Sequence, residues 1–282
     1  MTTEPSCDRI LAPGEDLGAA LASLRGGAVL GIPAGRWTGA LRLGRSVTLL
    51  GLAGAAEVVL DGDRAGPVIT VEEDDLDVRL VGLSLVNGFA QSGGAVSVTG
   101  FSRVALESCV LRDNRAGQGP GGALHVEAGQ LALVRCRVHD NEGRGGTAAL
   151  ADGVGVLTLQ DCLVVAAAPA GGAALRIRDS AEVTMAGSTV DGGAGAAVSV
   201  AGTSSRRPRL SVTGCLLSGA TSLDLDAAHG GRVHVTDSLL SGLAKGIFKP
   251  IGTVVMQGAL LLGAAPEPHR PAPGSPARGL VN

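Results

Sequence analysis

Aromatic side chains are almost absent from this chain of 282 residues. It has no tyrosine, and its aromatic residues are Trp37, Phe89, Phe101 and Phe248. Apolar residues nevertheless make up 45% of the sequence, so the core must be filled mainly by leucine, valine and isoleucine. Aliphatic side chains of this size suit a long, narrow core better than a thick globular one.

Two further absences restrict the partners and the location of the protein. The formal net charge is −3, so the chain lacks the basic excess of nucleic-acid-binding domains, and we expect no nucleic acid. No uninterrupted apolar run approaches about 18 residues, which argues against a membrane partner. Residues 1–18 show no basic start followed by an apolar stretch, so we expect a cytoplasmic location unless a leader has been removed.

Paired cysteine motifs are also missing. The sequence has 5 cysteines, an odd number, and none of them belongs to a C-x-x-C pair. Without an export signal, reduced thiols in a cytoplasm are the simplest interpretation. Cysteine nevertheless recurs in similar surroundings, as in LESCVLRDN at 106–114 and LVRCRVHDN at 133–141. This recurrence indicates either a metal site or a structural repeat.

An alignment on the cysteines extends the repeat along most of the chain. The aligned positions recur at intervals of roughly 25 residues and hold small or medium-sized residues: Leu52, Leu83, Cys109, Cys136, Cys162, Ser188, Cys215, Ser238 and Ala259. The positions three and five residues earlier and two residues later are apolar in nearly every repeat, as at Leu106, Val104 and Leu111. These flanking columns support the alignment.

A second segment of each repeat alternates between apolar and polar residues, as in GGAVSV and GGALHV. Alternation with a period of two predicts a β-strand with one buried face. Ile69 and Val71 are thus expected to point inward and Thr70 outward; in a later repeat we expect Leu150 inward and Ala151 outward. The cysteine segment adds two strands on either side of a bend, so each repeat holds three short strands.

Three short strands cannot bury their own apolar faces, but stacked repeats can. Stacking at about 4.8 Å per coil gives three parallel sheets around one core. The sequence therefore predicts an all-β parallel β-helix of about nine to ten coils over residues 27–263. Residues 1–26 should hold a short capping helix that begins at Asp16 and stops at Gly26, and the proline-rich residues 264–282 should form an extended tail.

The chain resembles the right-handed parallel β-helix superfamily, which has the pectin-lyase-like fold. The resemblance covers about residues 16–262, and the segment GAVLGIPAGRWTGALRLGRSVTLLG at 27–51 is similar to the first coil of many bacterial members. Asn114 and Asn141 share a position, where the superfamily often stacks asparagines inside a turn. The paired DN…GGA coils resemble generic bacterial β-helix repeats. The resemblance implies the fold and its right-handed winding, but it implies no single function.

Within such a fold the aligned cysteines point into the core, about 4.8 Å apart from coil to coil. A metal site needs ligands that converge on one point, whereas a column of single residues does not converge. Cys109, Cys136 and Cys162 are therefore predicted to be free thiols in the core, and we expect no resident metal. The pair Asp61 and Asp63 in LDGDRAG is interpreted as part of a turn.

The outward positions beside the asparagine turn bring charged residues together. Arg112 and His139 share one column, Asp113 and Asp140 share the next, and Arg137 projects nearby. The resemblance implies a use for such a group, because polysaccharide lyases of the superfamily need a base near the sugar C5 and a cation beside the uronate. In an enzyme, Arg112, Arg137 and His139 would be the catalytic residues. Asp113 and Asp140 would then bind the ligand, with Ca²⁺ as the cofactor.

Two classes of function remain open. The favoured one is a non-catalytic rod that acts as a scaffold or interaction module for a protein partner. Regular coils, short turns and a scarcity of catalytic residue types favour it. Lysine, for example, occurs only at Lys245 and Lys249. The alternative is a carbohydrate-active enzyme, a lyase, hydrolase or epimerase, whose substrate is a polysaccharide. This alternative requires the charged patch at 112–141 to lie in a groove.

Overall fold

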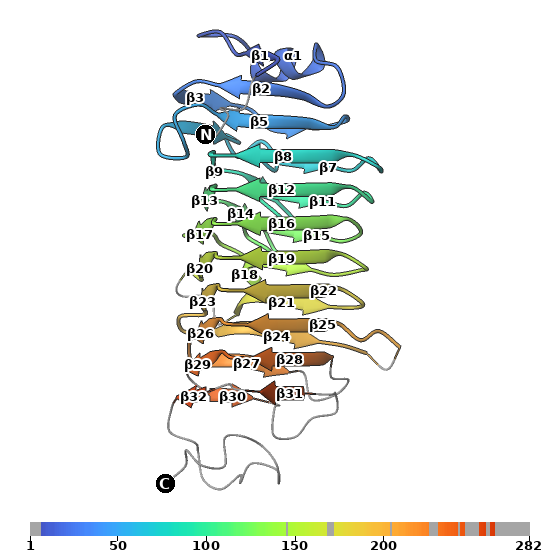
Figure 1. Ribbon diagram of the computed structural model, residues 1–282, viewed down its shortest axis with the longest axis vertical. Coiled ribbons are helices and arrows are strands. Elements are labelled where there is room, and N and C mark those ends of the chain that lie inside the picture. The colour runs from blue at the N-terminus through green and yellow to red at the C-terminus, as the bar shows by residue number, and fades with distance from the viewer. Residues whose placement is uncertain are drawn as a thin grey trace, which may run out of the picture.

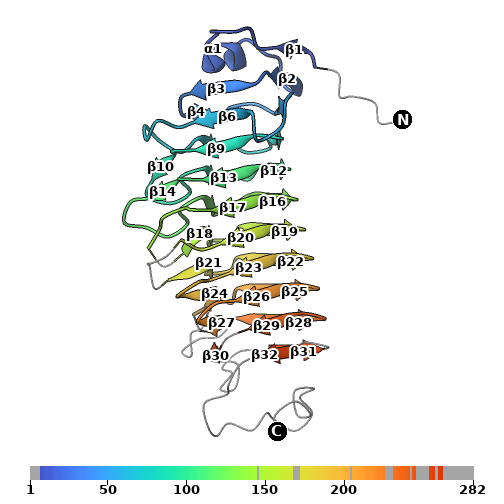
Figure 2. The same ribbon diagram turned by 90° about the vertical axis from the view of Figure 1, so that its left-hand side faces the viewer.

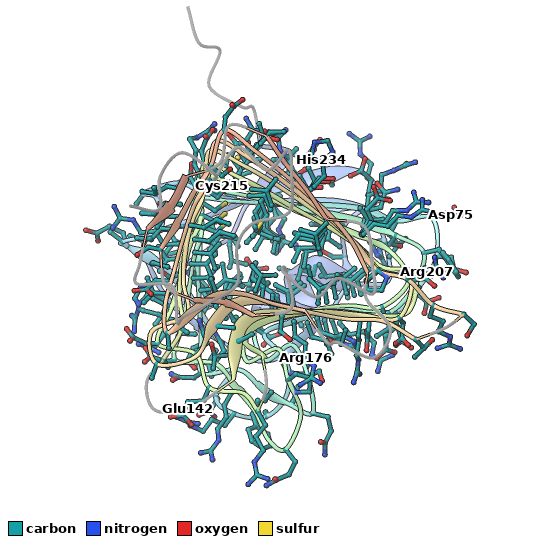
Figure 3. The ribbon with its side chains drawn as sticks, turned by 90° about the horizontal axis from the view of Figure 1, so that it is seen from below. Asp75, Glu142, Arg176, Arg207, Cys215 and His234 are labelled. Atoms are coloured by element: carbon teal, nitrogen blue, oxygen red, sulfur yellow. The ribbon has the colours of Figure 1, made fainter. Side chains whose placement is uncertain are left out.

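The protein is a single rod of stacked coils in a computed structural model (Figure 1; Figure 2). The structure describes residues 7–262, apart from residues 145, 168–171, 204, 226–230, 242, 246–253 and 258–259. Each regular coil contributes one strand to each of three parallel sheets, which we name sheets A, B and C. Seen along the axis, the three sheets enclose a core that is triangular in section (Figure 3).

Sheet A has 11 strands, each paired in parallel with the next. In spatial order they are β1 (Arg9–Ile10), β2 (Ala28–Ile32), β5 (Val47–Gly51), β8 (Asp77–Val81), β12 (Arg103–Glu107), β16 (Gln130–Val134), β19 (Val156–Gln160), β22 (Glu182–Ala186), β25 (Arg209–Thr213), β28 (Arg232–Thr236) and β31 (Val254–Gln257).

Sheet B has 10 strands and follows sheet A within each coil. Its strands are β3 (Gly35–Thr38), β6 (Val58–Asp61), β9 (Ser84–Val86), β13 (Val110–Arg112), β17 (Arg137–His139), β20 (Leu163–Val165), β23 (Thr189–Asp191), β26 (Leu216–Ser218), β29 (Leu239–Ser241) and β32 (Leu260–Leu262).

Sheet C has 9 strands and closes the coil. Its strands are β4 (Leu41–Arg42), β7 (Ile69–Val71), β11 (Val96–Val98), β15 (Leu124–Val126), β18 (Gly146–Ala151), β21 (Ala173–Arg178), β24 (Ala196–Ala201), β27 (Thr221–Leu225) and β30 (Leu243–Lys245). A separate pair, β10 (Phe89–Ala90) and β14 (Arg115–Ala116), lies in the turns between sheets B and C. The predicted all-β parallel β-helix with three sheets is confirmed.

A single residue with positive φ makes the bend between sheets A and B. Ser108, Arg135 and Asp161 have φ values of 53°, 52° and 54°, and Gly187 and Gly214 occupy the same place with 57° and 60°. This left-handed conformation turns the chain sharply, and glycine adopts it at little cost. The turn predicted just before each cysteine is therefore confirmed.

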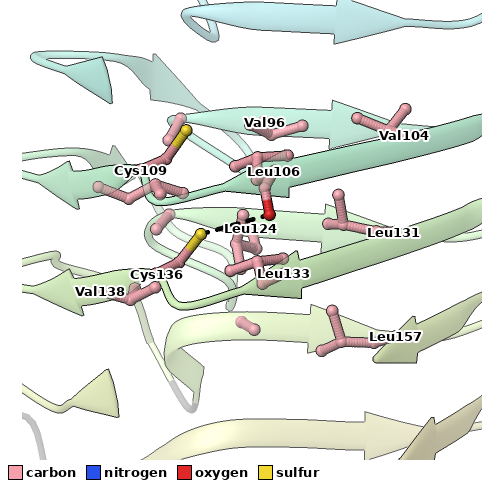
Figure 4. Packing of buried hydrophobic residues seen from close by; sticks show 14 of the residues in the cluster. Val96, Val104, Leu106, Cys109, Leu124, Leu131, Leu133, Cys136, Val138 and Leu157 are labelled. Atoms are coloured by element: carbon pink, nitrogen blue, oxygen red, sulfur yellow. Dashed lines mark hydrogen bonds between the residues drawn. The ribbon is translucent and has the colours of Figure 1, made fainter. Parts of the chain in front are cut away.

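The predicted inward columns form the core. Leu106, Leu133 and Leu159 are each 0% exposed, and the strand register places them directly on one another. Figure 4 shows the same layering on both sides of Leu133, where aliphatic side chains of successive coils are stacked. Burying one such leucine contributes about 1.5–3 kcal/mol to the stability of the fold. Each coil is therefore stable only when it is stacked on its neighbours.

The cysteines behave as small core residues. Cys109, Cys136, Cys162 and Cys215 are buried free thiols, as predicted. The Sγ of Cys136 donates a weak hydrogen bond to the carbonyl oxygen of Leu106, one coil earlier, at 3.5 Å (Figure 4). The stacked Cys109 thiol raises the pKa of Cys136 to about 12, and Cys136 in turn raises the pKa of Cys162. Within the described residues, no group of three or more His, Cys, Asp or Glu is placed to hold a metal ion.

The predicted asparagine stack is present in the turn after sheet B. Asn114 and Asn141 are both 1% exposed, and Asn114 Nδ2 donates to Asn141 Oδ1 at 3.0 Å. Each side chain also bonds backbone groups: Asn141 Nδ2 donates to the carbonyl oxygens of Leu111 and His139 at 2.9 and 2.8 Å. The buried amides thus satisfy the turn backbone as well as each other.

One expected core position is wrong at the N-terminal end. Leu52 was expected in the cysteine column, but it is 45% exposed. The chain does not bend directly into sheet B here, because residues 52–57 form a turn after β5. Val58, which is 0% exposed, fills the core at the start of β6 instead.

A second wrong assignment lies in β18. The register between β18 and β21 shifts between Gly146 and Ala149, so one extra residue is accommodated. Leu150 therefore stands in the outward column beside His125, and Ala151 points inward, the reverse of the expectation. Leu150 is still only 1% exposed, because the turn of the preceding coil packs against its outer side.

A short helix, α1 (Leu17–Ala22), covers the first coil as predicted. Its buried residues join the core, and the Asp16 side chain accepts a hydrogen bond from the Ala19 amide at 2.6 Å. The expected stop at Gly26 is wrong: Ser23 caps the helix three residues earlier, because its amide bonds the last free carbonyls. None of the described helices is long and apolar enough to cross a membrane. The tail predicted at 264–282 lies outside the described residues.

Candidate functional site

The charged patch predicted on sheet B lies on the outside of the rod. Arg112 in β13 pairs in register with His139 in β17, and Asp113 and Asp140 follow in turns with positive φ. Arg112 forms an ion pair with Asp113, and His139 Nδ1 lies 2.7 Å from Asp140 Oδ2. Arg137 is exposed beside them and has no ion pair among the described residues. Each acid is thus matched to the base that precedes it.

This patch is brought together as expected, but it is open to solvent. The side chains of Asp113 and Asp140 are 45% and 72% exposed. Exposed ion pairs of this kind contribute little to stability and are common on protein surfaces. Two carboxylates also fall short of the roughly six to eight oxygen ligands that Ca²⁺ takes.

A second polar group lies on the outer face of sheet C, where the repeat pattern predicts no site. His125 is the middle residue of β15, Asp152 directly follows β18, and Arg178 ends β21. His125 Nε2 lies 3.0 Å from Asp152 Oδ1, and Arg178 Nη2 donates to Asp152 Oδ2 at 2.7 Å. Three successive coils therefore contribute one residue each to a continuous chain of hydrogen bonds, which we call the His–Asp–Arg chain.

Strand alternation explains why these side chains face outward. Leu124 and Val126 fill the core, so His125 between them must point away from it. Ile177 is 0% exposed, which puts Arg178 on the outer face in the same way. Asp152 comes one residue after the inward Ala151 and therefore lies on that face as well.

The His–Asp–Arg chain is largely removed from water. The side chains of His125 and Asp152 are only 12% and 10% exposed. Burial by itself raises the pKa of Asp152, but the hydrogen bonds from His125 and Arg178 outweigh it and hold this pKa below its usual value. Asp152 is therefore a carboxylate at neutral pH. It orients the imidazole through Nε2, while Nδ1 has no hydrogen-bond partner among the described residues.

The turns between sheets B and C form a wall beside this chain. A Cβ on Gly93 would lie 2.7 Å from the Cβ of His125, so only glycine lets the backbone pass so closely. The walls of successive coils are themselves stacked, through the pairing of β10 with β14 and a bridge from Arg115 to Glu142. In Figure 3 these turns project from one side of the triangle, where Glu142 and Arg176 are labelled.

Two polar atoms beside the His–Asp–Arg chain are left unsatisfied. Among the described residues, the buried side-chain N and O atoms without a partner are Thr147 Oγ1 in β18 and Arg176 Nε in β21. The same two strands lead to Asp152 and carry Arg178. Buried polar groups without a partner are rare and costly, so a water molecule or a ligand group is expected to satisfy them.

The sequence could have indicated this site, but β18 was assigned a register that is wrong by one residue. His125 was correctly placed in an outward column. With Leu150 taken as inward, however, Asp152 also fell on the inward face and could not be connected to His125. The extra residue in β18 corrects the register by one position and brings the two side chains to the same face.

The sequence alone matches little that is known: no protein-family model and no curated protein sequence matches it. Solved structures do match. Pectate lyase Pel9A is similar with a TM-score of 0.55 at 14% identity, over 91% of this chain and 78% of that one. The pectin methylesterase PemA from Erwinia chrysanthemi gives 0.53 at 12% identity over 98% of both chains. The pectin methylesterase from Aspergillus niger gives 0.51 at 16% identity, over 94% and 88% of the two chains.

The protein has the right-handed, pectin-lyase-like β-helix fold. The fold expected from the repeat columns and from the resemblance is thereby confirmed. Identities of this size establish the architecture of the β-helix and leave its chemistry to be argued from its own residues.

Proposed function

We propose that this β-helix is a carbohydrate-active enzyme that removes the proton beside the carboxylate of a uronate unit in a polysaccharide. The observation that carries the proposal is the His–Asp–Arg chain on the outer face of sheet C. A histidine that is oriented by a buried carboxylate is the usual arrangement of a general base.

Each residue of the site has a distinct role. His125 is the base: Asp152 accepts a hydrogen bond from the proton-bearing Nε2, which leaves the lone pair of Nδ1 to take a proton. Arg178 positions Asp152 and keeps it ionised. Arg176 shares the outward column of His125, two coils away, and its Nε has no hydrogen-bond partner among the described residues. Its guanidinium is the donor for the uronate carboxylate.

The proposed reaction is an elimination that needs no oxidant or reductant. Nδ1 of His125 takes the proton from the carbon beside the carboxylate, while Arg176 stabilises the charge that develops on the carboxylate oxygens. The C–O bond to the neighbouring sugar breaks, its electron pair leaves with the oxygen, and a carbon–carbon double bond forms. The departing oxygen takes a proton from water. Return of a proton to the opposite face, without C–O cleavage, gives an epimer instead.

The similar solved structures support a polysaccharide as the ligand class. Those with the same architecture are named as a pectate lyase and as pectin methylesterases, and pectate and pectin are polysaccharides. At 12% and 14% identity this support for the ligand class is an analogy. The assignment of roles to His125, Asp152 and Arg176 depends on their own geometry.

The test is turnover of polygalacturonate and alginate, followed by the ultraviolet absorbance of the new double bond and by sugar analysis for epimers. His125→Ala should lower the rate by roughly 100-fold or more, as loss of a general base does. Arg103→Gln, an exposed change on sheet A, should leave it unchanged. Urea unfolding checks that each variant folds. Absence of turnover by the folded wild type, or full activity in His125→Ala, would overturn the proposal.

The non-catalytic rod is the second candidate, and one observation favours it. The outward column of sheet B is aliphatic at several positions where strand alternation usually places polar groups, namely at Val110, Leu163, Leu216 and Leu239. Leu163 is 42% exposed. A surface of this type suits an interaction module with a protein partner. A folded protein that is inert on every uronate polymer favours this candidate over the enzyme.

A further inference from the structure

An open depression of about 520 Å³ lies on the outer face of sheet A. Its polar lining comes from three successive strands, β22, β25 and β28, and consists of Glu182, Arg209, Ser211, Arg232 and His234. Figure 3 shows that His234 lies on a different side of the triangular section from Arg176. The depression is therefore separate from the His–Asp–Arg chain on sheet C.

Alternation along the strands creates this lining. Leu210 and Val233 are 1% and 2% exposed, so their neighbours in the same strands project outward. The register stacks Arg209 directly on Arg232, with Ser211 stacked on His234. The result is two columns that cross neighbouring coils, one carrying guanidinium groups and one carrying hydrogen-bonding groups.

The stacked arginines are not neutralised within the described residues. Two like charges directly opposite each other on neighbouring strands destabilise a sheet. Glu182 pairs in register with Arg209 on the side away from Arg232, but it forms no ion pair with either arginine.

Elsewhere on sheet A, two arginines are neutralised by an acid that lies between them. Glu107 lies between Arg79 and Arg135, bonds Arg79 at 2.7 Å and forms a second ion pair with Arg135. The hydrogen bond from Arg79 holds the pKa of Glu107 below its usual value, even though partial burial raises it. There the protein supplies the anion between two arginines, whereas between Arg209 and Arg232 the described residues supply none.

We infer that the depression binds the carboxylates of an anionic carbohydrate chain. Arg209 and Arg232 hold the carboxylate oxygens with charge-assisted hydrogen bonds. Ser211, His234 and Glu182 provide the donors and acceptors that sugar hydroxyls require. This binding site does not depend on catalysis at His125, because the two sites lie on different sheets.

Other anions fit the depression less well. Proteins that bind single-stranded nucleic acid rely on aromatic side chains for stacking, and the depression is lined by none. The net charge of −3 also disfavours a densely charged phosphate polymer. A free phosphate ion would leave most of a 520 Å³ depression, including its hydroxyl and carboxylate groups, without a partner.

Calorimetric titration of the full chain with a hexamer of galacturonate tests the inference. The wild type should bind the hexamer, and added salt should weaken the binding. The double variant Arg209→Gln, Arg232→Gln should bind it roughly tenfold more weakly or worse, as loss of charged hydrogen bonds predicts. A control of equal charge, Arg64→Gln with Arg103→Gln, should bind like the wild type.

Two further measurements separate a binding site from a structural role. The Arg209→Gln, Arg232→Gln variant should keep or raise the melting temperature, because it removes a repulsion between like charges. His125→Ala should bind the hexamer as the wild type does, so failure of the enzyme proposal leaves this inference standing.

Several outcomes overturn the inference. They are failure of the wild type to bind the hexamer, equal binding by the double variant, and a clear fall in the melting temperature of that variant. Tighter binding of neutral maltohexaose, inorganic phosphate or an oligonucleotide than of the hexamer also overturns it, because each assigns the depression to a different ligand class.

Discussion

His125 and Asp152 lie in neighbouring coils and are joined by a 3.0 Å contact between Nε2 and Oδ1, although 27 residues separate them in the sequence. A β-helix brings residues one coil apart into contact along its whole length, so such pairs are easily formed. This pair is distinguished by its burial and by the guanidinium of Arg178 on the other carboxylate oxygen. Charge, burial and orientation therefore coincide at one place on the outer surface.

Asp152→Asn tests the energetic weight of this pair. The change keeps the shape of the side chain but removes the charge that His125 and Arg178 share. We expect the free energy of unfolding at neutral pH to fall by roughly 1.5–3 kcal/mol, the usual contribution of a hydrogen bond to a charged group. Asp140→Asn on the exposed patch is the control, and it should change the free energy by less than about 0.5 kcal/mol.

The loss of stability in Asp152→Asn should depend on pH. Because the folded pKa of Asp152 lies below its usual value of 3.8, its stabilisation is complete above that value and is lost as the pH falls through the folded pKa. Urea unfolding should therefore show a large difference between wild type and Asp152→Asn at neutral pH. The two curves should converge at the most acidic pH at which both still fold. A difference that stays constant with pH would contradict this account.

Leu133→Ala tests the stacked core. Leu133 is 0% exposed and lies between Leu106 and Leu159, so its truncation leaves a cavity that neighbouring coils cannot close. We expect a loss of about 2–5 kcal/mol in the free energy of unfolding, measured by urea denaturation. Arg207→Ala, at an exposed position of a turn, should cost less than about 0.5 kcal/mol. Equal losses at both positions would mean that inside and outside are assigned wrongly.

The fold was predictable because each repeat restates the same physical constraint. Inward positions such as Leu106, Leu133 and Leu159 recur at nearly constant spacing. An ambiguous assignment in one coil can therefore be settled by comparison with the neighbouring coils. The bend was visible for a similar reason, since the position before the aligned cysteines often holds a turn-forming residue, such as Asp161 or Gly214. The exceptions, Leu52 and Leu150, occur where a turn or an extra residue interrupts the repeat.

The candidate site was less predictable, because it depends on differences between coils rather than on their likeness. His125 and Asp152 are single departures from the repeat, and their contact requires the register of β18, which one extra residue changes. The patch of Arg112 and His139 was found because both residues follow the repeat. Repetition therefore reveals the scaffold and its stacked surface groups, but it hides a site built from irregular positions.

The buried thiols should be chemically inert in the folded protein. The thiolate is the reactive form, and the pKa of Cys136 is raised to about 12, while burial raises that of Cys215. The hydrogen bond with Cys136 lowers the pKa of Cys109, but this thiol is only 1% exposed, so a reagent cannot reach it in the folded protein. Alkylation with iodoacetamide near pH 8 should therefore leave Cys109, Cys136, Cys162 and Cys215 unmodified. Unfolding in urea should expose all four to complete modification. Peptide mass spectrometry measures both, and rapid labelling of Cys136 in the native state, or a disulfide within this column, would contradict the prediction.

Calcium should not stabilise the protein through Asp113 and Asp140. Each carboxylate is already matched to an adjacent base, Arg112 or His139, and both are well exposed. An ion that bound the folded state alone would raise the melting temperature by mass action. We therefore expect the same melting temperature in millimolar calcium and in a chelator, for the wild type and for the Asp113→Asn, Asp140→Asn variant. A calcium-dependent rise that this variant abolishes would instead show that the two carboxylates bind the ion together, and it would return the charged patch of sheet B to consideration as a uronate site.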